Sequence, residues 1–384
     1  MDYKDKLYQL IKMLSERHLD FFYDKSKEEI DLLIENSLQK FKLENDYDFL
    51  YISNYLIKHI IGDIDDHTKV TNPDETLFYP LKLKFINNEL FIIDCPDNMQ
   101  EHKYKKIEKI NGIDINQIIN EISESTCYLT DNWLYSMIEY KLSNNVDIKS
   151  LPSVNPNDDI VFNVEGCDVN ISKICEPKKE KNEYDSPISY NVDADIMKID
   201  YRICKENYEG QISDIIKEIE NTTKELNISK FIIDLRENTG GVSWLINPLI
   251  DVLKDKEIIT LCDRGTFSGG FFACETMRKL GSKFVGETPG GTYNFFADCP
   301  PFKLDKFNVY CSTKYFYYHP FDDRIVSANN TEELDEIKDN PEFFKRKNFD
   351  IDVYVEQTIE DYINQADRIL ETSKDILRGS NKKI

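Results

Sequence analysis

The feature that most constrains the fold is an alternation of short apolar segments and amphipathic segments between residues 196 and 285. The apolar segments have the length and composition of buried strands. They are residues 196–201, 231–235, 257–261 and 283–285. The segments between them carry apolar residues at helical spacing, such as Ile212, Ile215, Ile216, Ile219 and Leu226. Strands and helices that alternate at these lengths predict an α/β core, in which helices pack against a layered sheet.

Two other patterns precede this core. Up to about residue 62, leucines and isoleucines recur at helical spacing, which predicts a small helical segment. From about residue 76, apolar and polar residues alternate, and Asn87-Asn88 separates two such runs, which predicts a β-hairpin. Asn111-Gly112 marks a second tight turn before another helical pattern. The chain therefore begins with helices and continues with a mixed region before the α/β core.

Charge and cysteine content exclude several classes of function. The formal net charge of -23 repels phosphate backbones and anionic lipid, so we expect neither nucleic acid nor a membrane as a partner. The first ten residues carry charges where a signal peptide needs an apolar core, and no apolar run is long enough to span a bilayer. The nine cysteines form no CxxC pair, which favours reduced thiols in a cytoplasmic protein and no thiol metal site. The high content of Lys, Ile and Asn is typical of proteins from AT-rich bacterial genomes.

Two predicted strand-to-helix turns carry candidates for chemistry. In residues 234–241 a buried strand runs into Gly240 and Gly241, whose N–H groups can approach a ligand closely. In residues 265–270 Ser268 precedes a helix, so its hydroxyl would lie beside free N–H groups and the positive end of the helix dipole. A plain turn for the glycines and a serine N-cap for Ser268 are the alternative interpretations.

The third candidate is His67, in the polar stretch 62–68. The chain has only five histidines, so candidates for a general base are few. A structural or exposed loop histidine is the alternative. One class of enzyme is disfavoured directly, because Thr266 stands where the nucleophile elbow of an α/β-hydrolase requires glycine.

These stretches resemble the tail-specific, or C-terminal processing, serine peptidases. Phe231–Gly241 is similar to that family's strand followed by Asp-Leu-Arg-x-Asn-x-Gly-Gly, and Thr266–Gly290 is similar to its Thr-x-Ser nucleophile segment. Asp65–Thr68 is similar to its early Asp-Gly-His-Thr element. Further landmarks follow at Cys311–Phe316, Phe349–Val353 and Thr358–Tyr362. The set runs in the expected order from about residue 62 to 370.

The resemblance implies a layered core related to the crotonase and Clp-protease folds. It implies a helical segment at residues 1–75, a PDZ-like region at 76–150, a connection at 151–190 and the serine-peptidase core at 191–384. The connection contains the polar stretch 168–187, which also reads as a surface loop. The family cleaves polypeptides or peptides, near C-termini in particular, without a metal or another cofactor. A homo-oligomer is compatible with this assignment.

The resemblance also implies roles for individual residues. Many members pair the serine with a later lysine, but residues 289–294 contain none, so the chain is most similar to the tricorn-like branch, which uses an early histidine. Ser268 is then the nucleophile and His67 the general base. The backbone N–H groups of an oxyanion hole come from Gly240 or Gly241 and from Gly269. The candidates for an acid that orients the histidine are Asp66, Glu287, Asp322 and Asp323.

Two other functions remain open at this point. A non-catalytic protein with the same fold would bind a chain end by adding it as a strand to the PDZ-like region. A crotonase-type acyl-thioester enzyme would use two backbone N–H groups to polarise a carbonyl, but the sequence lacks an evident basic cluster for the phosphates of CoA.

Overall fold

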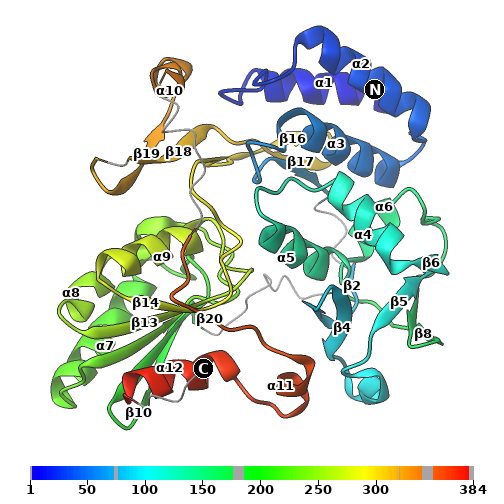
Figure 1. Cartoon of the computed structure of the whole chain (residues 1–384). Helices are drawn as coiled ribbons and strands as arrows, with labels where there is room; N and C mark the ends of the chain where they lie inside the picture. The colour runs from blue at the N-terminus through cyan, green and yellow to red at the C-terminus, as the bar shows by residue number, and fades with distance from the viewer. Residues whose placement is uncertain (1, 73–76, 176–185, 320, 340–348, 380–384) are drawn as a thin grey trace. The chain divides into compact units, whose positions relative to one another are not determined.

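The structure is a computed structural model that describes residues 2–72, 77–175, 186–319, 321–339 and 349–379. The chain forms two compact units (Figure 1). Unit 1 consists of residues 1–178 and 293–347, and unit 2 of residues 179–292 and 348–384. Among the described helices, none is both long and apolar enough to cross a membrane.

Unit 2 is built on a six-stranded sheet in the order β10-β11-β12-β13-β14-β20. All neighbouring strands are parallel except β10, which pairs antiparallel with β11. The strands are β10 (Ile188–Asp193), β11 (Ile196–Tyr201), β12 (Lys230–Asp234), β13 (Glu257–Cys262), β14 (Lys283–Gly286) and β20 (Val353–Tyr354). The central strands are buried on both faces, which is why they read as continuous apolar runs.

Helices cover both faces of this sheet, with α7, α8 and α9 on one face and α12 on the other (Figure 1). The helices of unit 2 are α7 (Gln211–Glu225), the 3-10 turn η2 (Ser243–Ile246), α8 (Leu249–Leu253), α9 (Gly269–Lys279), α11 (Ile359–Ile363) and α12 (Arg368–Leu377). Ile369 and Leu377 of α12 pack on Ile232, Ile259 and Val285 of the sheet. The predicted α/β core with helices against a sheet is therefore confirmed.

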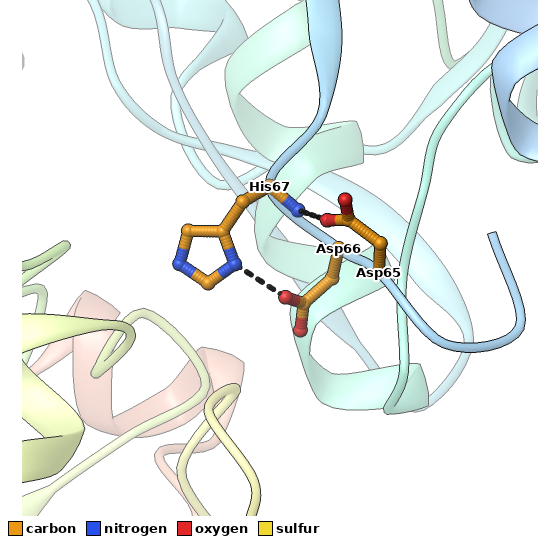
Figure 2. Close-up of side chains that lie close together, drawn as sticks. All are labelled: Asp65, Asp66 and His67. Atoms are coloured by element: carbon orange, nitrogen blue, oxygen red, sulfur yellow. Dashed lines mark hydrogen bonds and ion pairs between the residues drawn. The ribbon is translucent and has the colours of Figure 1, made fainter. Parts of the chain in front are cut away.

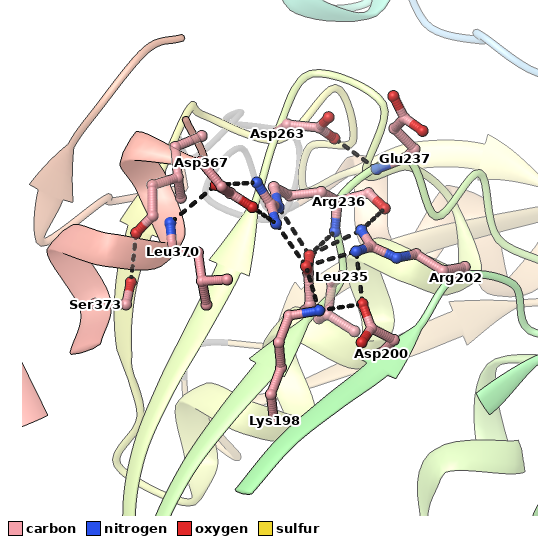
Figure 3. Close-up of polar contacts among 12 residues, drawn as sticks. Lys198, Asp200, Arg202, Leu235, Arg236, Glu237, Asp263, Asp367, Leu370 and Ser373 are labelled. Atoms are coloured by element: carbon pink, nitrogen blue, oxygen red, sulfur yellow. Dashed lines mark hydrogen bonds and ion pairs between the residues drawn. The ribbon is translucent and has the colours of Figure 1, made fainter. Parts of the chain in front are cut away.

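A buried ion-pair network closes the carboxyl end of β12 (Figure 3). Asp234 is fully buried, and both of its oxygens accept hydrogen bonds from Arg202 and from Arg236, at 2.6–2.9 Å. Arg236 also donates two hydrogen bonds of 2.8 Å to Asp367, the residue that caps α12. The network thus joins the ends of β11 and β12 to the C-terminal helix.

Unit 1 begins with three helices, α1 (Tyr3–Ser15), α2 (Lys27–Lys40) and α3 (Asp46–Ile61). The predicted helical segment is confirmed, and Asn45 and Ser26 begin α3 and α2 with capping boxes. Ten residues of α3 are buried, so this helix is the centre of the unit rather than a surface element.

Both predicted turns of the mixed region are confirmed. Asn87 and Asn88 have φ of 51° and 63° between β3 (Lys82–Ile86) and β4 (Glu89–Asp94). Positive φ at both positions is the geometry of a type I′ hairpin turn, which asparagine tolerates well. Asn111 and Gly112 form the second turn. It joins β5 (Ile107–Ile110) to β6 (Ile113–Asp114), and the four-stranded sheet β6-β5-β7-β8 is completed by β7 (Val161–Val164) and β8 (Cys167–Asn170).

The remaining elements of unit 1 complete its core. The helices are η1 (Asp97–His102), α4 (Ile115–Glu124), α5 (Asp131–Lys141), α6 (Asn145–Ser150) and α10 (Thr331–Lys338). The short strands are β1 (Lys69–Thr71), β2 (Leu77–Phe78), β9 (Ile174–Cys175), β15 (Phe295–Ala297), β16 (Pro301–Leu304), β17 (Phe307–Tyr310), β18 (Lys314–His319) and β19 (Arg324–Ala328). Half of the predicted polar loop at 168–187 falls on residues 176–185, which lie outside the described residues. In its described half the prediction is partly wrong, because residues 168–170 belong to β8 and residues 174–175 form β9.

Residues 293–347 belong to unit 1, although the sequence groups them with the predicted core at 191–384. The physical reason is strand pairing: β17 pairs antiparallel with β1, so that Lys69 lies opposite Tyr310. A segment near the end of the chain is thereby held to the segment that follows His67. The boundaries of the PDZ-like region, the connection and the core remain a prediction.

We expect the substitution Asp234→Asn to lower the free energy of unfolding by about 3–5 kcal/mol, since it leaves buried cations without their central carboxylate. Urea denaturation measures this change. The matched control is Asp195→Asn, which removes an exposed pair with Lys230 and should cost less than about 1 kcal/mol. Equal losses in the two variants would contradict the role of the network.

The same carboxylate predicts a pH dependence. Burial alone would raise the pKa of Asp234, but the charges of Arg236, Arg202 and Lys198 hold it well below its usual range. A depressed pKa in the folded state stabilises the fold above the unfolded value of about 3.9 and ceases to do so as the pH falls through the folded pKa. The difference in stability between the wild type and Asp234→Asn should therefore be constant above about pH 5 and shrink in more acidic buffer. A difference that does not change on acidification would refute this assignment.

Candidate functional site

Ser268 occupies a strained turn between β13 and α9 in unit 2. Its φ of 50° and ψ of -119° lie outside the regions that L-residues normally adopt. The side chain stands at the N-cap position of α9 but makes no capping hydrogen bond within the described residues. The serine N-cap interpretation is therefore not supported. Strain of this kind is concentrated at functional sites, because the surrounding structure must impose it.

The two glycine-containing turns approach each other as closely as backbones allow. A Cβ atom on Gly240 would lie 2.6 Å from the Gly269 nitrogen and 2.8 Å from the Ser268 Cβ atom. A Cβ atom on Gly269 would lie 2.9 Å from the Gly241 nitrogen. Gly240 and Gly241 also have φ of 104° and 124°, which side chains resist. The structure thus brings Ser268, Gly240, Gly241 and Gly269 together.

Two amide groups in this cluster have no protein acceptor in the described part of the chain. Gly241 and Cys204 form an isolated parallel β-bridge. The hydrogen bonds of this bridge are made by the peptide groups on either side of Gly241, and the Gly241 N–H takes part in neither of them. The Gly269 N–H is the first of α9, where a helix leaves its amides unsatisfied. The Gly240 N–H, in contrast, donates to the Asn238 side chain at 3.0 Å. Gly241 and Gly269 are therefore the pair that can bind an oxyanion, and Gly240 provides the space between them.

Buried polar side chains hold the two turns in place. The Thr266 hydroxyl donates to the Leu235 carbonyl at 2.9 Å, which links the end of β13 to the end of β12. Asn238 is fully buried and donates to the Tyr201 carbonyl at 2.8 Å. Asp263 accepts a hydrogen bond of 2.8 Å from the Glu237 amide (Figure 3). It also accepts one of 3.0 Å from the Gly265 amide. The sequence prediction missed these positioning roles, although Thr266 and Asn238 stand in the motifs that it identified.

His67 lies in unit 1, in the loop between α3 and β1. Its Nδ1 atom is 2.6 Å from the Asp66 carboxylate (Figure 2). Its ring stacks on Phe295, with ring centres 5.5 Å apart and planes inclined by 13°. A carboxylate on one side of the ring and an aromatic face against it fix the orientation of the imidazole.

Asp65 holds the backbone of the same loop, a role that the sequence prediction missed. One of its oxygens accepts from the amides of His67 and Thr68 at 2.6 and 3.0 Å. The other lies 3.1 Å from the buried His18 ring and accepts from the Thr68 hydroxyl. The amide of Ser312, in the predicted landmark 311–316, in turn donates to that hydroxyl at 3.0 Å. An Asp side chain that accepts a hydrogen bond from the amide two residues later forms an Asx turn. The sequence signal for this role was therefore an Asp two residues before His67.

The two neighbouring carboxyls differ in their pKa shifts. Burial raises the pKa of Asp66, and the hydrogen bond from His67 opposes this only partly. Burial would also raise the pKa of Asp65, but hydrogen bonds from His18 and Thr68 hold it below its usual value. The ligand atoms of Asp65, Asp66 and His67 lie within 4.8 Å of one another, as a metal site would require. Both Asp65 oxygens are already used by protein donors, so the cluster is explained without an ion.

The other candidate acids have partners of their own. Glu287, in unit 2, accepts a hydrogen bond of 2.7 Å from Arg264. Asp323, in unit 1, accepts from the Tyr318 hydroxyl at 2.5 Å. Asp322 lies beside His319 and Arg324, at 3.5 and 3.2 Å. Among the candidates, Asp66 is the one that the described structure places in contact with His67.

Comparisons with known proteins identify the fold. No protein-family model matches the chain, and no curated protein matches it. A mutant form of CPAF matches with a TM-score of 0.62 and 11% identity, over 100% of this chain and 98% of that chain. Mature CPAF complexed with lactacystin matches with a TM-score of 0.60 and 11% identity, over 99% of both chains. The photosystem II D1 C-terminal processing protease matches less well, with a TM-score of 0.48 and 9% identity, over 93% of this chain and 94% of that chain.

At these identities the likeness concerns the fold alone. The chain has a mixed α/β fold that is similar to the fold of CPAF. The mixed α/β fold class predicted from the sequence is thereby confirmed, and the PDZ-like region within it remains a prediction.

The close approach of the two turns makes a direct prediction. Gly240→Ala should lower the free energy of unfolding by about 2–5 kcal/mol, because it combines a positive φ with overlap against backbone atoms. The matched control is Gly281→Ala, at which φ is 78° and no atom lies within 4 Å of the added Cβ. That control should cost only about 1–2 kcal/mol. Thermal or urea denaturation compares the two, and an equal cost would show that the turns can separate without penalty.

Proposed function

We propose that this protein is a serine peptidase that cleaves peptide bonds of polypeptides or peptides, near C-termini in particular. Ser268 is its nucleophile and His67 its general base, so the protein belongs functionally with the Ser-His rather than the Ser-Lys branch. The observation that carries the proposal is the strained Ser268 beside the two unpaired amides of Gly241 and Gly269. The sequence resemblance to the C-terminal processing peptidases and the fold shared with CPAF support the same reaction class.

The proposed reaction proceeds through an acyl-enzyme. The Ser268 hydroxyl attacks the scissile carbonyl while His67 takes its proton, and the resulting oxyanion accepts hydrogen bonds from the Gly241 and Gly269 amides. Collapse of this intermediate breaks the peptide bond, and His67 gives its proton to the leaving amine. Water then attacks the ester by the same route in reverse, which releases the new carboxylate and restores Ser268.

Asp66 orients the base in this proposal. With Nδ1 hydrogen-bonded to Asp66, Nε2 is the atom that exchanges the proton. The Asp66 carboxylate also stabilises the imidazolium that forms when His67 takes the proton. The proposal requires His67 of unit 1 to come within hydrogen-bond reach of Ser268 of unit 2 during the reaction.

Labelling with a fluorophosphonate, read by intact mass, tests the proposal. The wild type should gain one adduct, and Ser268→Ala should gain none. His67→Ala should react at least about 100-fold more slowly, since a general base contributes that much or more. Asp66→Asn should slow the reaction at least about tenfold, through the orientation and charge of the base.

Ser243→Ala is the matched control, because Ser243 begins η2 a few residues after Gly241 and has no role in the proposal. It should react like the wild type. An adduct that persists in Ser268→Ala would refute the assignment of the nucleophile. A folded wild type that gains no adduct over hours would favour the non-catalytic, peptide-binding function instead.

A further inference from the structure

His67 is the first of three aromatic rings that stack on one another in unit 1. Phe295 of β15 lies against the His67 ring, with ring centres 5.5 Å apart and planes inclined by 13°. Phe316 of β18 stacks on Phe295 in turn, with ring centres 5.7 Å apart and planes inclined by 22°. The register of the two antiparallel strands places Phe316 directly opposite Phe295. The pairing of β15 with β18 therefore fixes the place of the ring on which His67 lies.

The residue after Phe295 fastens β15 to the His67 loop. Phe296 forms a parallel β-bridge with Asp65, and its ring centre lies 4.6 Å from that of His18. The His18 ring itself lies 3.1 Å from the Asp65 carboxylate. Successive side chains of a strand point to opposite faces, so Phe295 and Phe296 point in opposite directions. One residue thus anchors the strand to the loop, and the other presents its ring to His67.

Burial shields the contact between the rings from water. Phe295 is only 3% exposed, and the His67 side chain is 13% exposed. Water screens electrostatic interactions poorly at such a place, so an attraction between the two rings is stronger there than at an open surface.

The contact affects the two charge states of His67 differently. In the proposed reaction His67 takes the Ser268 proton and becomes an imidazolium. The face of an aromatic ring carries negative charge and attracts a cation that lies within about 6 Å of the ring centre. The separation of 5.5 Å between the His67 and Phe295 rings meets this condition. A neutral imidazole gains less from the same contact, and an interaction that strengthens towards the transition state increases the rate.

Phe295 also acts at a different part of His67 from the neighbouring carboxylates. Asp66 contacts the edge of the imidazole, at Nδ1. Asp65 accepts a hydrogen bond from the backbone amide of His67. Phe295 lies against the face of the ring. The edge and the face of the imidazolium therefore receive separate stabilisation.

We infer that Phe295 is a positioning residue for His67, whose imidazolium form it stabilises through its ring face. Phe316 supports the Phe295 ring in that position. The effect on the reaction rate rests on the proposed function, whereas the contact between the rings does not.

Replacement of Phe295 by pentafluorophenylalanine tests the effect of the ring face. This side chain keeps an aromatic ring but reverses the sign of the charge on its face, so fluorophosphonate labelling should become at least about fivefold slower. The smaller change to para-fluorophenylalanine should give a rate between that of the pentafluoro protein and that of the wild type. Phe295→Tyr should stay within about threefold of the wild type, since tyrosine offers a similar ring face.

The matched control is pentafluorophenylalanine at Phe302, on β16. The Phe302 ring lies 4.3 Å from the Arg17 guanidinium, so this control removes a cation–π contact elsewhere in unit 1 and should leave the labelling rate unchanged. Thermal denaturation checks that each protein is folded. Labelling of the two fluorinated Phe295 proteins at the wild-type rate would overturn the inferred role of the ring face.

Nuclear magnetic resonance of isotope-labelled histidine tests the contact without any reaction. The chain has five histidines, so the His67 signal can be assigned by its loss in His67→Ala. A neighbouring ring shifts the signal of a proton above its face upfield, so the His67 ring protons should move downfield in Phe295→Leu. Phe302→Leu should leave them in place.

The two readouts separate the inference from the proposed function. A His67 signal that does not move in Phe295→Leu would show that the rings are not in contact, and it would overturn the inference. A wild type that shows the shifted His67 signal but gains no adduct would instead refute the proposed peptidase function and leave the contact established.

Discussion

The Asp234 carboxylate, buried between two arginines, is the interaction on which unit 2 depends. It holds the end of β12 to the end of β11 through Arg202 and to the C-terminal helix through Arg236 and Asp367. The chain leaves this network directly into the turn that contains Asn238 and Gly240. Because the start of that turn is fixed, the position of Gly240 against Ser268 is fixed as well. A surface ion pair could not do this, since solvent and side-chain entropy would loosen it.

Parallel pairing of β12 and β13 explains why the two turns meet. Neighbouring parallel strands end at the same edge of a sheet, so the segments after Asp234 and after Cys262 emerge side by side. Glycine on both sides then allows contact between backbones, and Thr266 and Asn238 secure it with buried hydrogen bonds. The strain at Ser268 is the cost of this contact, and the surrounding hydrogen bonds offset it.

The sequence predicts most of the local structure because the signals for it are local. The apolar run before Asp234 has the composition of a buried strand, and Asn87-Asn88 has the φ preference of a tight turn. The motif around Ser268 could also be located, since its residues follow one another in the chain. What the sequence does not show is contact between distant segments. His18 reaches Asp65, and β17 pairs with β1, through packing that no local spacing encodes.

Asp65 and Asp66 show how such packing decides chemistry. The two residues are neighbours in sequence and are both buried, so composition alone would give them the same properties. Hydrogen bonds from His18, Thr68 and two amides stabilise the charge of Asp65, whereas Asp66 has the His67 ring as its main partner. Pairs of acids whose environments separate their pKa values are typical of sites where one holds structure and the other takes part in proton transfer. On this argument Asp65 maintains the loop, and Asp66 is the carboxyl through which the surroundings of the loop influence His67.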